Sequence, residues 1–449
     1  TSKDETEKLN EILRNNSFSH IKLSGEAEPE QEIAKIDTAL EELEKEKKAI
    51  RDSIKSLADN LPDLEVYYEY LMNNKLRVAA AENFLRTDRI NVIKGYIPTD
   101  READFRKAVE ASQKNAYYLE IAEADKDDPQ VPILLKNSRF ARAFESITTM
   151  YGLPKYNEID PTPLLAPFYL FFFGMMVADL GYGLIMLVGT LIALKVANLS
   201  EDQKNFLRFF FYLSFPTMFW GFIYGSFLGG IVPMKVYIDP ATQYQEVLIL
   251  SVAFGIIHLF FGLGIKAYMN IRDGKYLDAL YDVGFWIMIL VGAILYFVNM
   301  AIPMAPVVKT IATVLMVVSA IGIILTGERG ASSIVGRIFG GLYSLYGISS
   351  YVGDFVSYSR LMGLGLSGGF IGAAINMMVR MLLPNGIVGI VAAVILFVGG
   401  QIFNLFIGAL GAYVHAIRLT YVEFFSKFYE GGGKAFNLFR SKPKYINLK

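Results

Sequence analysis

The sequence predicts a mostly α-helical, polytopic membrane protein with a polar N-terminal region that contains a small α/β lobe. Of the 449 residues, 53% are hydrophobic and only 19% are charged. The charged residues gather in residues 1–160, whereas residues 161–449 hold apolar runs of the length that spans a bilayer. The chain has no cysteine, which excludes disulfides, thiolate metal sites and cysteine nucleophiles. We therefore expect two domains, residues 1–160 and residues 161–449.

The first predicted element is a helical arm with a coiled-coil seam over residues 33–61. Apolar residues recur there at alternating spacings of three and four, with one break at Lys47; they are Ile33, Ile36, Leu40, Leu43, Ile50, Ile54, Leu57 and Leu61. Such a seam requires a partner helix, and residues 1–160 contain no second heptad pattern of that length. We expect the partner before Thr1, in a chain truncated at its N-terminus, or on another chain. A solvated, charged helix is the alternative.

A β-α-β lobe is expected after the arm. The pattern predicts helices at residues 64–86 and 100–114 and strands at residues 92–98 and 117–121. Residues 431–435 lack the leading glycine and the Ser/Thr after lysine of a phosphate loop, and we interpret them as a flexible tail. The three histidines are too scattered for a zinc site. No catalytic residue, cofactor, metal site or nucleic-acid partner is therefore predicted.

Seven apolar segments follow. Six of them are residues 205–231, 247–269, 282–300, 305–326, 339–379 and 386–426. The first, residues 164–196, would be about 50 Å long as one helix, whereas bilayer hydrocarbon is about 30 Å thick. Asp179 and two glycines interrupt it. We therefore expect a bent hairpin of two short helices, with Asp179 as a candidate carboxylate for ion passage or helix pairing.

Charge placement predicts the orientation of these segments. If the C-terminus is cytoplasmic, loops 198–204, 270–277 and 327–337 lie on its side and carry most of the loop lysines and arginines. The opposite loops carry only Lys235 and Arg380, with Lys309 near a boundary. The positive-inside rule therefore puts the C-terminus in the cytoplasm. The N-terminal region shows no export signal and is expected there too, so the number of spans is even, and we predict eight.

The last two segments are unusually long and carry polar faces. Each would be about 60 Å long as a helix, twice the hydrocarbon thickness, so we expect both to be tilted. In the last segment, the polar or small residues at helical spacing are Gln401, Asn404, Gly408, Gly411, His415 and Arg418. In the segment before it, Ser350, Gly353, Ser357, Arg360, Gly363 and Ser367 share a face, with Gly365, Gly368, Gly369 and Gly372 nearby. Small residues let another helix approach closely.

Arg360 lies in the middle of its apolar segment, and any proposed function must account for a charged residue there. Arginine keeps its proton in proteins, and a charge at this depth marks a functional site and needs an interior partner or water. No partner carboxylate for it is apparent in the chain, although Asp354 is a candidate carboxylate for ion passage or helix pairing. A structural ion pair or a side chain snorkelling to the interface is the alternative for Arg360 and Arg418. His258 is interpreted as a packed core histidine.

Five motifs occur in order along the chain. They are YGLPKYNEIDPT at 151–162, FGMMVADLGYG at 173–183, SYSRL at 357–361, HAIRL at 415–419 and VEFFSKFY at 422–429. Over essentially its whole length the chain resembles the membrane stator subunit of V-type (A/V-type) rotary ATPases, called subunit a or subunit I. Its short loops are more similar to the prokaryotic form. The fold that this resemblance implies is the polytopic helical domain and stator arm expected above.

The resemblance also implies a function. Such a subunit belongs to the membrane (Vo) sector of the ATPase complex and lies in the cell membrane, beside a rotating ring of c/K proteolipid subunits. It provides two half-channels for H⁺ or Na⁺, coupled to ATP hydrolysis or synthesis. Peripheral stalk subunits (E/G type), a central stalk attachment subunit (d/C type) and membrane lipid are its further partners. A stand-alone secondary ion transporter or exchanger is the alternative, but no inverted repeat is apparent; a purely structural scaffold would leave Arg360 unexplained.

Site residues follow from the resemblance position by position. Arg360 matches the family's essential arginine, and Arg418 matches a second functional arginine. The further residues expected on the ion path are His415, Asp354, Ser357, Gln401 and Asn404, and those expected to face the ring are Gly363, Ser367, Gly368 and Gly372. Two positions depart from some relatives, which carry Glu at the position of Gly408 and His at that of Asp354.

Overall fold

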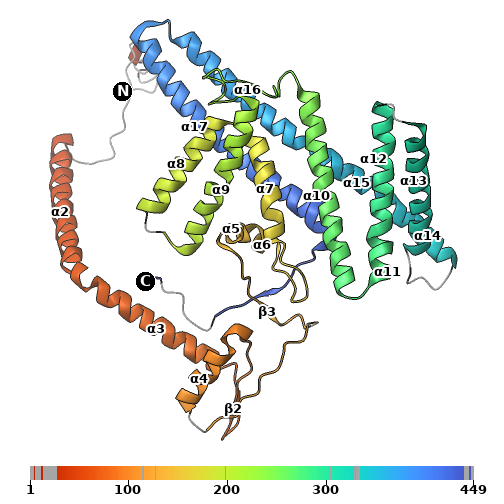
Figure 1. The fold of residues 1–449 in the computed structure, drawn as a ribbon. Coiled ribbons are helices and arrows are strands. Elements are labelled where there is room, and N and C mark those ends of the chain that lie inside the picture. Colours follow the sequence, from red (N-terminus) through yellow and green to blue (C-terminus); the bar gives the residue numbers. More distant parts are fainter. Residues whose placement is uncertain are drawn as a thin grey trace. The chain divides into compact units, whose positions relative to one another are not determined.

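The computed structural model describes residues 5, 12–13, 28–113, 116–126, 128–197, 199–302, 305–327, 329, 334–438 and 444–445. The chain divides into two compact units, one of Thr1–Gly95 with Leu438–Lys449 and one of Tyr96–Asn437. The architecture is mostly α-helical, as predicted, and the strands are only two residues long (Figure 1).

The first unit is built around a long helical arm. Its elements are α2 (Pro29–Ser56), the 3₁₀ turn η1 (Ala58–Asn60), α3 (Leu61–Ala81), β1 (Leu85–Arg86) and β2 (Asn91–Val92). The eight apolar residues of the predicted seam are 53–63% exposed. The arm is therefore helical as expected, while its pairing in a coiled coil stays a prediction. The expected strand 92–98 is wrong beyond Val92, because β2 is only one arm of a tight hairpin with β1.

The second unit begins with η2 (Thr99–Arg101), α4 (Glu102–Gln113), β3 (Pro132–Ile133), α5 (Arg139–Arg142) and α6 (Glu145–Tyr151). Residues 117–121 are not in a strand, so the predicted β-α-β order is wrong at this point. Instead, β3 pairs in parallel with β4 (Lys434–Ala435) at the far end of the chain. The Gly433 N–H also donates to the Leu153 carbonyl at 2.8 Å. Residues 431–434 are therefore fixed by pairing, and the expected flexible tail is wrong.

The remaining elements of the second unit are helices with apolar sequences. They are α7 (Thr162–Val177), α8 (Leu180–Val196), α9 (Glu201–Tyr224), α10 (Tyr244–Arg272), α11 (Tyr276–Ala279), η3 (Leu280–Gly284, a π-turn), α12 (Phe285–Ala301), α13 (Pro306–Thr326), α14 (Ile334–Tyr346), α15 (Ile348–Ser357), α16 (Ser359–Leu382), α17 (Gly386–Arg418), η4 (Leu419–Phe425, a π-turn) and α18 (Ser426–Phe428). Among the described residues, six helical stretches are long and apolar enough to span a membrane, and they match the six long predicted segments. The chain is therefore a multi-pass membrane protein.

The predicted break in the first apolar block is confirmed. Helix α7 ends at Val177, Ala178 takes a left-handed conformation with φ of 36°, and Asp179 caps α8 by accepting from the Tyr182 N–H at 3.0 Å. Helix α9 packs against both short helices, in yellow and yellow-green in Figure 1. A Cβ on Gly221 of α9 would lie 2.1 Å from the Leu180 nitrogen. This glycine lets α9 touch the break directly.

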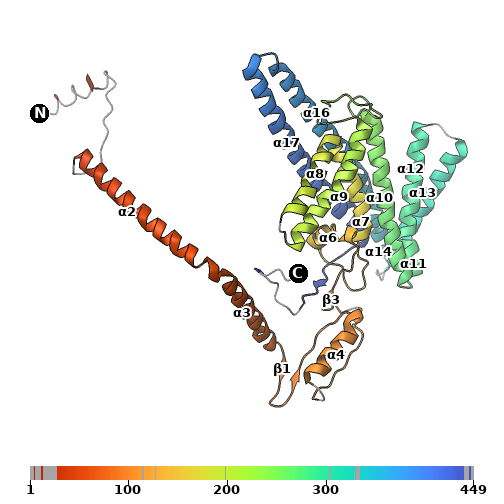
Figure 2. The same ribbon diagram turned by 60° about the vertical axis from the view of Figure 1, so that its left-hand side comes forward.

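The main core joins the α5–α6 turn to the membrane helices through aromatic side chains. Phe144, Tyr169, Phe209 and Phe424 are fully buried in it, from the α5–α6 turn, α7, α9 and η4. A second cluster lies between α10, α12 and α13, at the side of the bundle where α12, α13 and α14 stand together (Figure 2). Between membrane helices such clusters are stabilised mainly by close van der Waals packing, because lipid tails are as apolar as the side chains themselves.

The two long final segments are present but interrupted. One stretch covers Val335–Leu382 and the other Gly386–Phe428, with 48 and 43 residues. The first is interrupted at Tyr358, where α15 ends and α16 begins, and the second changes from α-helix to the π-turn η4 after Arg418. Helices α16 and α17 lie side by side over much of their length (Figures 1 and 2). Their tilt in a bilayer stays a prediction.

Candidate functional site

Arg360 has an internal counter-ion in this chain. Its Nη2 donates to Glu423 Oε1 at 2.9 Å, and its Nε donates to the Ser357 carbonyl at 2.9 Å. The Glu423 side chain is 1% exposed, whereas that of Arg360 is 20% exposed. The expectation that the chain offers no partner for Arg360 is therefore wrong. A buried carboxylate needs such a partner, because an isolated charge in a medium of low polarity is very unfavourable.

A second ion pair lies beside the first. Lys427 Nζ donates to Asp354 Oδ2 at 2.6 Å, and both side chains are nearly buried. The Lys427 ammonium also lies 4.3 Å from the centre of the Tyr351 ring, close enough for a cation–π contact. Asp354 is thus held in an ion pair between helices. Of the two roles that the sequence left open for it, ion passage and helix pairing, this contact favours helix pairing.

Both ion pairs occur where two helices depart from regular geometry. Arg360 is in the first turn of α16, just after the interruption at Tyr358, and Glu423 is in the π-turn η4. Local π-turns often mark functional sites. Tyr358 is held by packing, because its hydroxyl lies 2.8 Å from His258 Nδ1 and its ring occupies the space where Gly255 lacks a side chain. His258 is 1% exposed among aromatic rings, which confirms it as a core histidine.

His415 and Arg418 complete the cationic part of the site. His415 is close enough to both Arg360 and Arg418 to interact with them electrostatically, and its Nδ1 is buried without a hydrogen-bond partner among the described residues. Arg418 is exposed, and the described part of the chain gives it no ion pair. The structure thus brings together four of the predicted residues: Arg360, Ser357, His415 and Arg418.

Gln401 and Asn404 lie in a different polar cluster, further along α17. Asn404 donates to the Tyr182 hydroxyl at 2.7 Å and to the Gly368 carbonyl at 3.0 Å. The Tyr182 hydroxyl in turn donates to Gln401 Oε1. Gln401 Nε2 donates to Asn376 Oδ1 at 2.9 Å. This hydrogen-bonded cluster joins α8, α16 and α17 in the interior of the bundle.

Asn376 ties this cluster to the loop after α9. Its amide donates to the Leu228 and Gly229 carbonyls at 2.8 and 2.9 Å. Asp179 holds the same loop from the other side, accepting from the Leu228 and Gly229 N–H groups at 2.9 Å each and from the Ser226 hydroxyl. Asp179 is 3% exposed and fully engaged in these bonds. Of its two open roles, the contacts favour helix pairing.

Three of the four small residues expected to face a ring lie at least partly on the surface of α16. Gly363 and Ser367 are exposed, Gly368 is half-buried, and a side chain at Gly363 or Gly368 would meet only open space. Gly372 is different. It is buried, and a Cβ there would lie 2.8 Å from the Gly229 Cα of the loop after α9. The expectation for Gly372 is therefore corrected: the glycine admits this chain's own loop.

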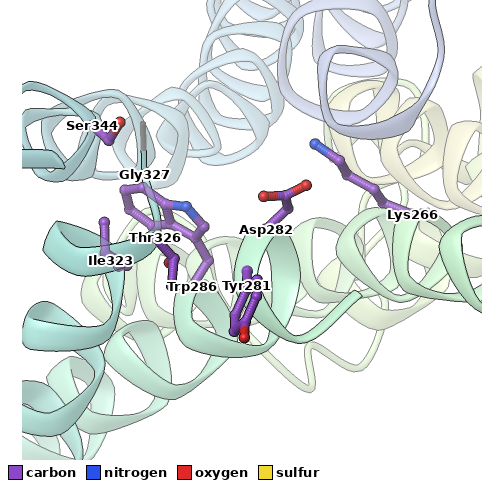
Figure 3. A pocket seen from close by; sticks show the side chains of 8 residues that line it. All are labelled: Lys266, Tyr281, Asp282, Trp286, Ile323, Thr326, Gly327 and Ser344. Carbon is purple, nitrogen blue, oxygen red and sulfur yellow. The ribbon is translucent and has the colours of Figure 1, made fainter. Parts of the chain in front are cut away.

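A cavity of about 320 Å³ opens at another point of the bundle, between α10, η3, α13 and α14 (Figure 3). Its lining residues are Lys266, Tyr281, Asp282, Trp286, Ile323, Thr326, Gly327 and Ser344. The Lys266 and Asp282 side chains point toward each other in Figure 3, and Asp282 also pairs with Arg329. The Trp286 ring lies 4.9 Å from the Tyr351 ring that Lys427 covers. One aromatic layer thus separates this cavity from the Asp354–Lys427 pair.

Outside the membrane helices, one ion pair fastens the 151–162 motif to the end of the 422–429 motif. Lys155 pairs with Glu430. The hydrogen bond to Lys155 lowers the pKa of the Glu430 carboxyl, and the same bond raises the pKa of the Lys155 ammonium. Both groups are solvent-exposed, so the pair orders the surface and adds little stability. Among the described residues, no group of three His, Asp or Glu side chains could hold a metal ion.

The fold and this site define a polytopic helical membrane protein with two ion pairs inside its bundle, one of them reaching the surface through Arg360. The chain matches the V-type ATPase 116kDa subunit family over residues 2–237. Along its full length it is 32% identical to the A-type ATP synthase subunit I of Pyrococcus horikoshii, of which it covers 69%. The chain therefore belongs to this family and is a membrane subunit of the V-type ATPase class.

Two further relatives agree with this assignment. The A-type ATP synthase subunit I of Methanocaldococcus jannaschii is 29% identical over 99% of this chain and 69% of its own length. The V-type ATP synthase subunit I of Borreliella burgdorferi is 24% identical over 78% of this chain and 60% of its own length. The similarity thus extends to both archaeal and bacterial subunits.

Proposed function

We propose that this chain is the stator subunit of the membrane sector of a rotary ATPase. In this role it provides two half-channels for H⁺ or Na⁺, and Arg360 meets the ion-carrying carboxylates of a rotating c/K ring. The observation that carries the proposal is the position of Arg360: the residue lies in the first turn of α16, just after the helix is interrupted at Tyr358, and its side chain is one-fifth exposed. The exposed Gly363 and Ser367, three and seven residues later on α16, leave room beside it for a passing helix.

The mechanism follows from the free energy of a charge in lipid. A ring carboxylate crosses the bilayer only when it is protonated or holds its cation, because the bare charge is strongly disfavoured there. Near Arg360 the ionised form becomes favourable, since a neighbouring cation stabilises a carboxylate. The ion then leaves through one half-channel, and the next empty carboxylate is loaded from the other. The charge of Arg360 also opposes the direct passage of cations between the two.

Two polar zones on α17 support the idea of two half-channels. One contains His415 and Arg418 beside Arg360, with Ser357 and Asp354 nearby; the other contains Gln401 and Asn404. Fourteen residues separate Gln401 from His415, which is about 21 Å along a helix. The zones therefore lie at different depths, as the linings of two half-channels must.

The arm and the partners belong to the same proposal. The exposed apolar stripe of α2 fits a coiled-coil arm that contacts peripheral stalk subunits of E/G type, and a d/C-type subunit connects the ring to the central stalk. We place the subunit in the cell membrane, with the N-terminal region and the C-terminus in the cytoplasm, on the charge distribution of the loops.

The test is Arg360→Ala in the assembled complex, reconstituted in vesicles. We expect ATP-driven ion uptake to fall to background while ring and stalk subunits still co-purify. Arg380→Ala is the matched control, because Arg380 is an exposed arginine at the other end of α16 and should keep normal uptake. Normal uptake by the Arg360→Ala complex would refute the proposal. Uptake by the chain alone, without ring or ATPase head, would indicate a stand-alone transporter.

A further inference from the structure

The two side chains of the Arg360–Glu423 pair differ in exposure: Glu423 is buried in the bundle, whereas Arg360 is partly at its surface. Because the Glu423 carboxylate is enclosed by protein, it stays beside Arg360, and no group from outside the chain can replace it. The guanidinium uses Nη2 for Glu423 and Nε for Ser357, while Nη1 is buried and has no hydrogen-bond partner among the described residues. Arginine holds its donors in a fixed, planar fork. The contact with Glu423 therefore fixes the plane of the guanidinium of Arg360, whose side chain is one-fifth exposed.

The charge balance around the guanidinium depends on the same contact. The groups that face Arg360 or Glu423 are His415, Asp354 and Tyr358. Lys427 in turn pairs with Asp354, and Arg418 lies near His415. Lys427 is already paired with Asp354, so these two charges largely cancel. His415 and Arg418 add no negative charge. Glu423 is thus the fixed charge that offsets Arg360, and its removal would leave the site distinctly more positive.

We propose that Glu423 is a positioning residue for ion transfer: it aims Arg360 and partly neutralises it, so that a mobile carboxylate is discharged there but released again. This inference rests on the proposed function, in which Arg360 meets such a carboxylate. A guanidinium without Glu423 would attract the mobile carboxylate more strongly. That carboxylate would then stay ionised down to lower pH and would leave Arg360 more slowly.

The experiment compares the pH dependence of ATP-driven uptake in reconstituted complexes that carry Glu423→Gln or no substitution. We expect Glu423→Gln to lower the maximal rate several-fold. We also expect it to move the acid limb of the profile to lower pH by about one unit, the size of shift that one neighbouring charge produces. A purely structural role of Glu423 would change the amount of assembled complex without moving the limb. An unmoved acid limb in the assembled variant would overturn the inference.

Glu430→Gln is the matched control, since it removes a carboxylate that follows Glu423 by seven residues, pairs with Lys155 outside the membrane helices and does not touch Arg360. Its amide oxygen can still accept from Lys155, and the limb should stay in place. An equal shift in this control would also overturn the inference, because the effect would then not depend on the contact with Arg360.

Glu423→Asp provides a second route if the glutamine variant does not assemble. Aspartate keeps the charge but is one methylene shorter, so it weakens the 2.9 Å contact, and the limb should move in the same direction by less. No shift with aspartate would count against the inference. Arg360→Ala distinguishes a failure of the proposed function from a failure of this inference. ATP-driven ion uptake by that variant would refute the proposed function. If that variant takes up no ions and the acid limb of the pH profile is unmoved in the Glu423 variants, only the role of Glu423 is refuted.

Discussion

Arg360 shows how a charge can be kept in an apolar bundle and still be presented at its surface. Its Nη2 is satisfied by an enclosed carboxylate and its Nε by a backbone carbonyl. Lysine could not reproduce this arrangement, because its ammonium is a single point of charge without the planar fork that serves several partners at once. The site therefore depends on the planar geometry of the guanidinium as well as on its charge.

The neighbouring Asp354–Lys427 pair makes a prediction about stability. Removing one partner of a buried pair leaves an uncompensated charge, at a typical cost of about 3–5 kcal/mol. Lys427→Met leaves Asp354 in that state, so we expect a clear loss of unfolding free energy for the detergent-solubilised protein. The double variant Asp354→Leu with Lys427→Met should recover most of the loss, since the apolar pair carries no buried charge. Thermal unfolding followed by circular dichroism measures both, and equal stabilities of the single and double variants would contradict the prediction.

Sequence reasoning found Arg360 and its neighbours but missed their partners. A signal was present: Glu423 and Lys427 are one helical turn apart on the last segment, opposite in sign to Arg360 and Asp354 on the segment before. Matching these signs requires knowing that η4 is a π-turn and that α16 begins after an interruption at Tyr358, because these features set which side chains meet. Tyr182 and Asn376 were missed for a similar reason, since their hydrogen bonds connect segments far apart in the chain.

At the scale of elements, the breaks in the helices differ in how far local sequence determines them. The break between α7 and α8 was predictable, because a capping aspartate and glycines coincide there. The interruption between α15 and α16 carries no proline and no such cap. It arises from the burial of Tyr358 against Gly255 and His258 of α10, a tertiary effect. The strand expected at residues 117–121 failed likewise, because its β-type residues find no partner strand there in the structure.

The loop after α9 gives a prediction that separates backbone strain from close packing. Gly229 and Gly230 have similar positive φ values, 68° and 81°, but only Gly229 is packed: a Cβ there would lie 2.4 Å from the Gly372 carbonyl carbon, whereas Gly230 faces open space. Gly230→Ala should therefore cost only the left-handed strain of about 1–2 kcal/mol. Gly229→Ala adds a clash with a backbone that cannot yield, of about 1–3 kcal/mol more.

The measurement for this pair is the melting temperature of the solubilised protein. We expect Gly229→Ala to melt several degrees below Gly230→Ala, and Gly230→Ala somewhat below the unsubstituted chain. Equal melting temperatures for the two variants would show that the loop does not pack against α16 as described. The comparison tests the anchoring of this loop without relying on transport.

At the scale of the whole molecule, sequence length and hydropathy were sufficient for the six long spans, and the family follows from similarity over the full chain. Length and hydropathy alone do not determine how many times the chain crosses the membrane. That number depends on the short helices α7 and α8, of 16 and 17 residues, each about 24–26 Å long and so slightly shorter than the hydrocarbon layer. Their reversal at Asp179 is in the structure, but whether each crosses the membrane decides the orientation of everything that follows.

The absence of cysteine from the sequence allows this topology to be tested one thiol at a time. Single cysteines at the exposed positions Glu123 and Asp202 lie before α7 and after α8, and two crossings place them on the same side of the membrane. A membrane-impermeant maleimide should therefore label both from the cytoplasmic side of sealed vesicles, together with Lys275→Cys, and should label Ala241→Cys and Asn385→Cys only from the other side. Detergent should make all five reactive, and the unsubstituted chain gives the background. Labelling of Glu123→Cys and Asp202→Cys from opposite sides would mean that α7 and α8 together cross once, and the eight-span topology would be wrong.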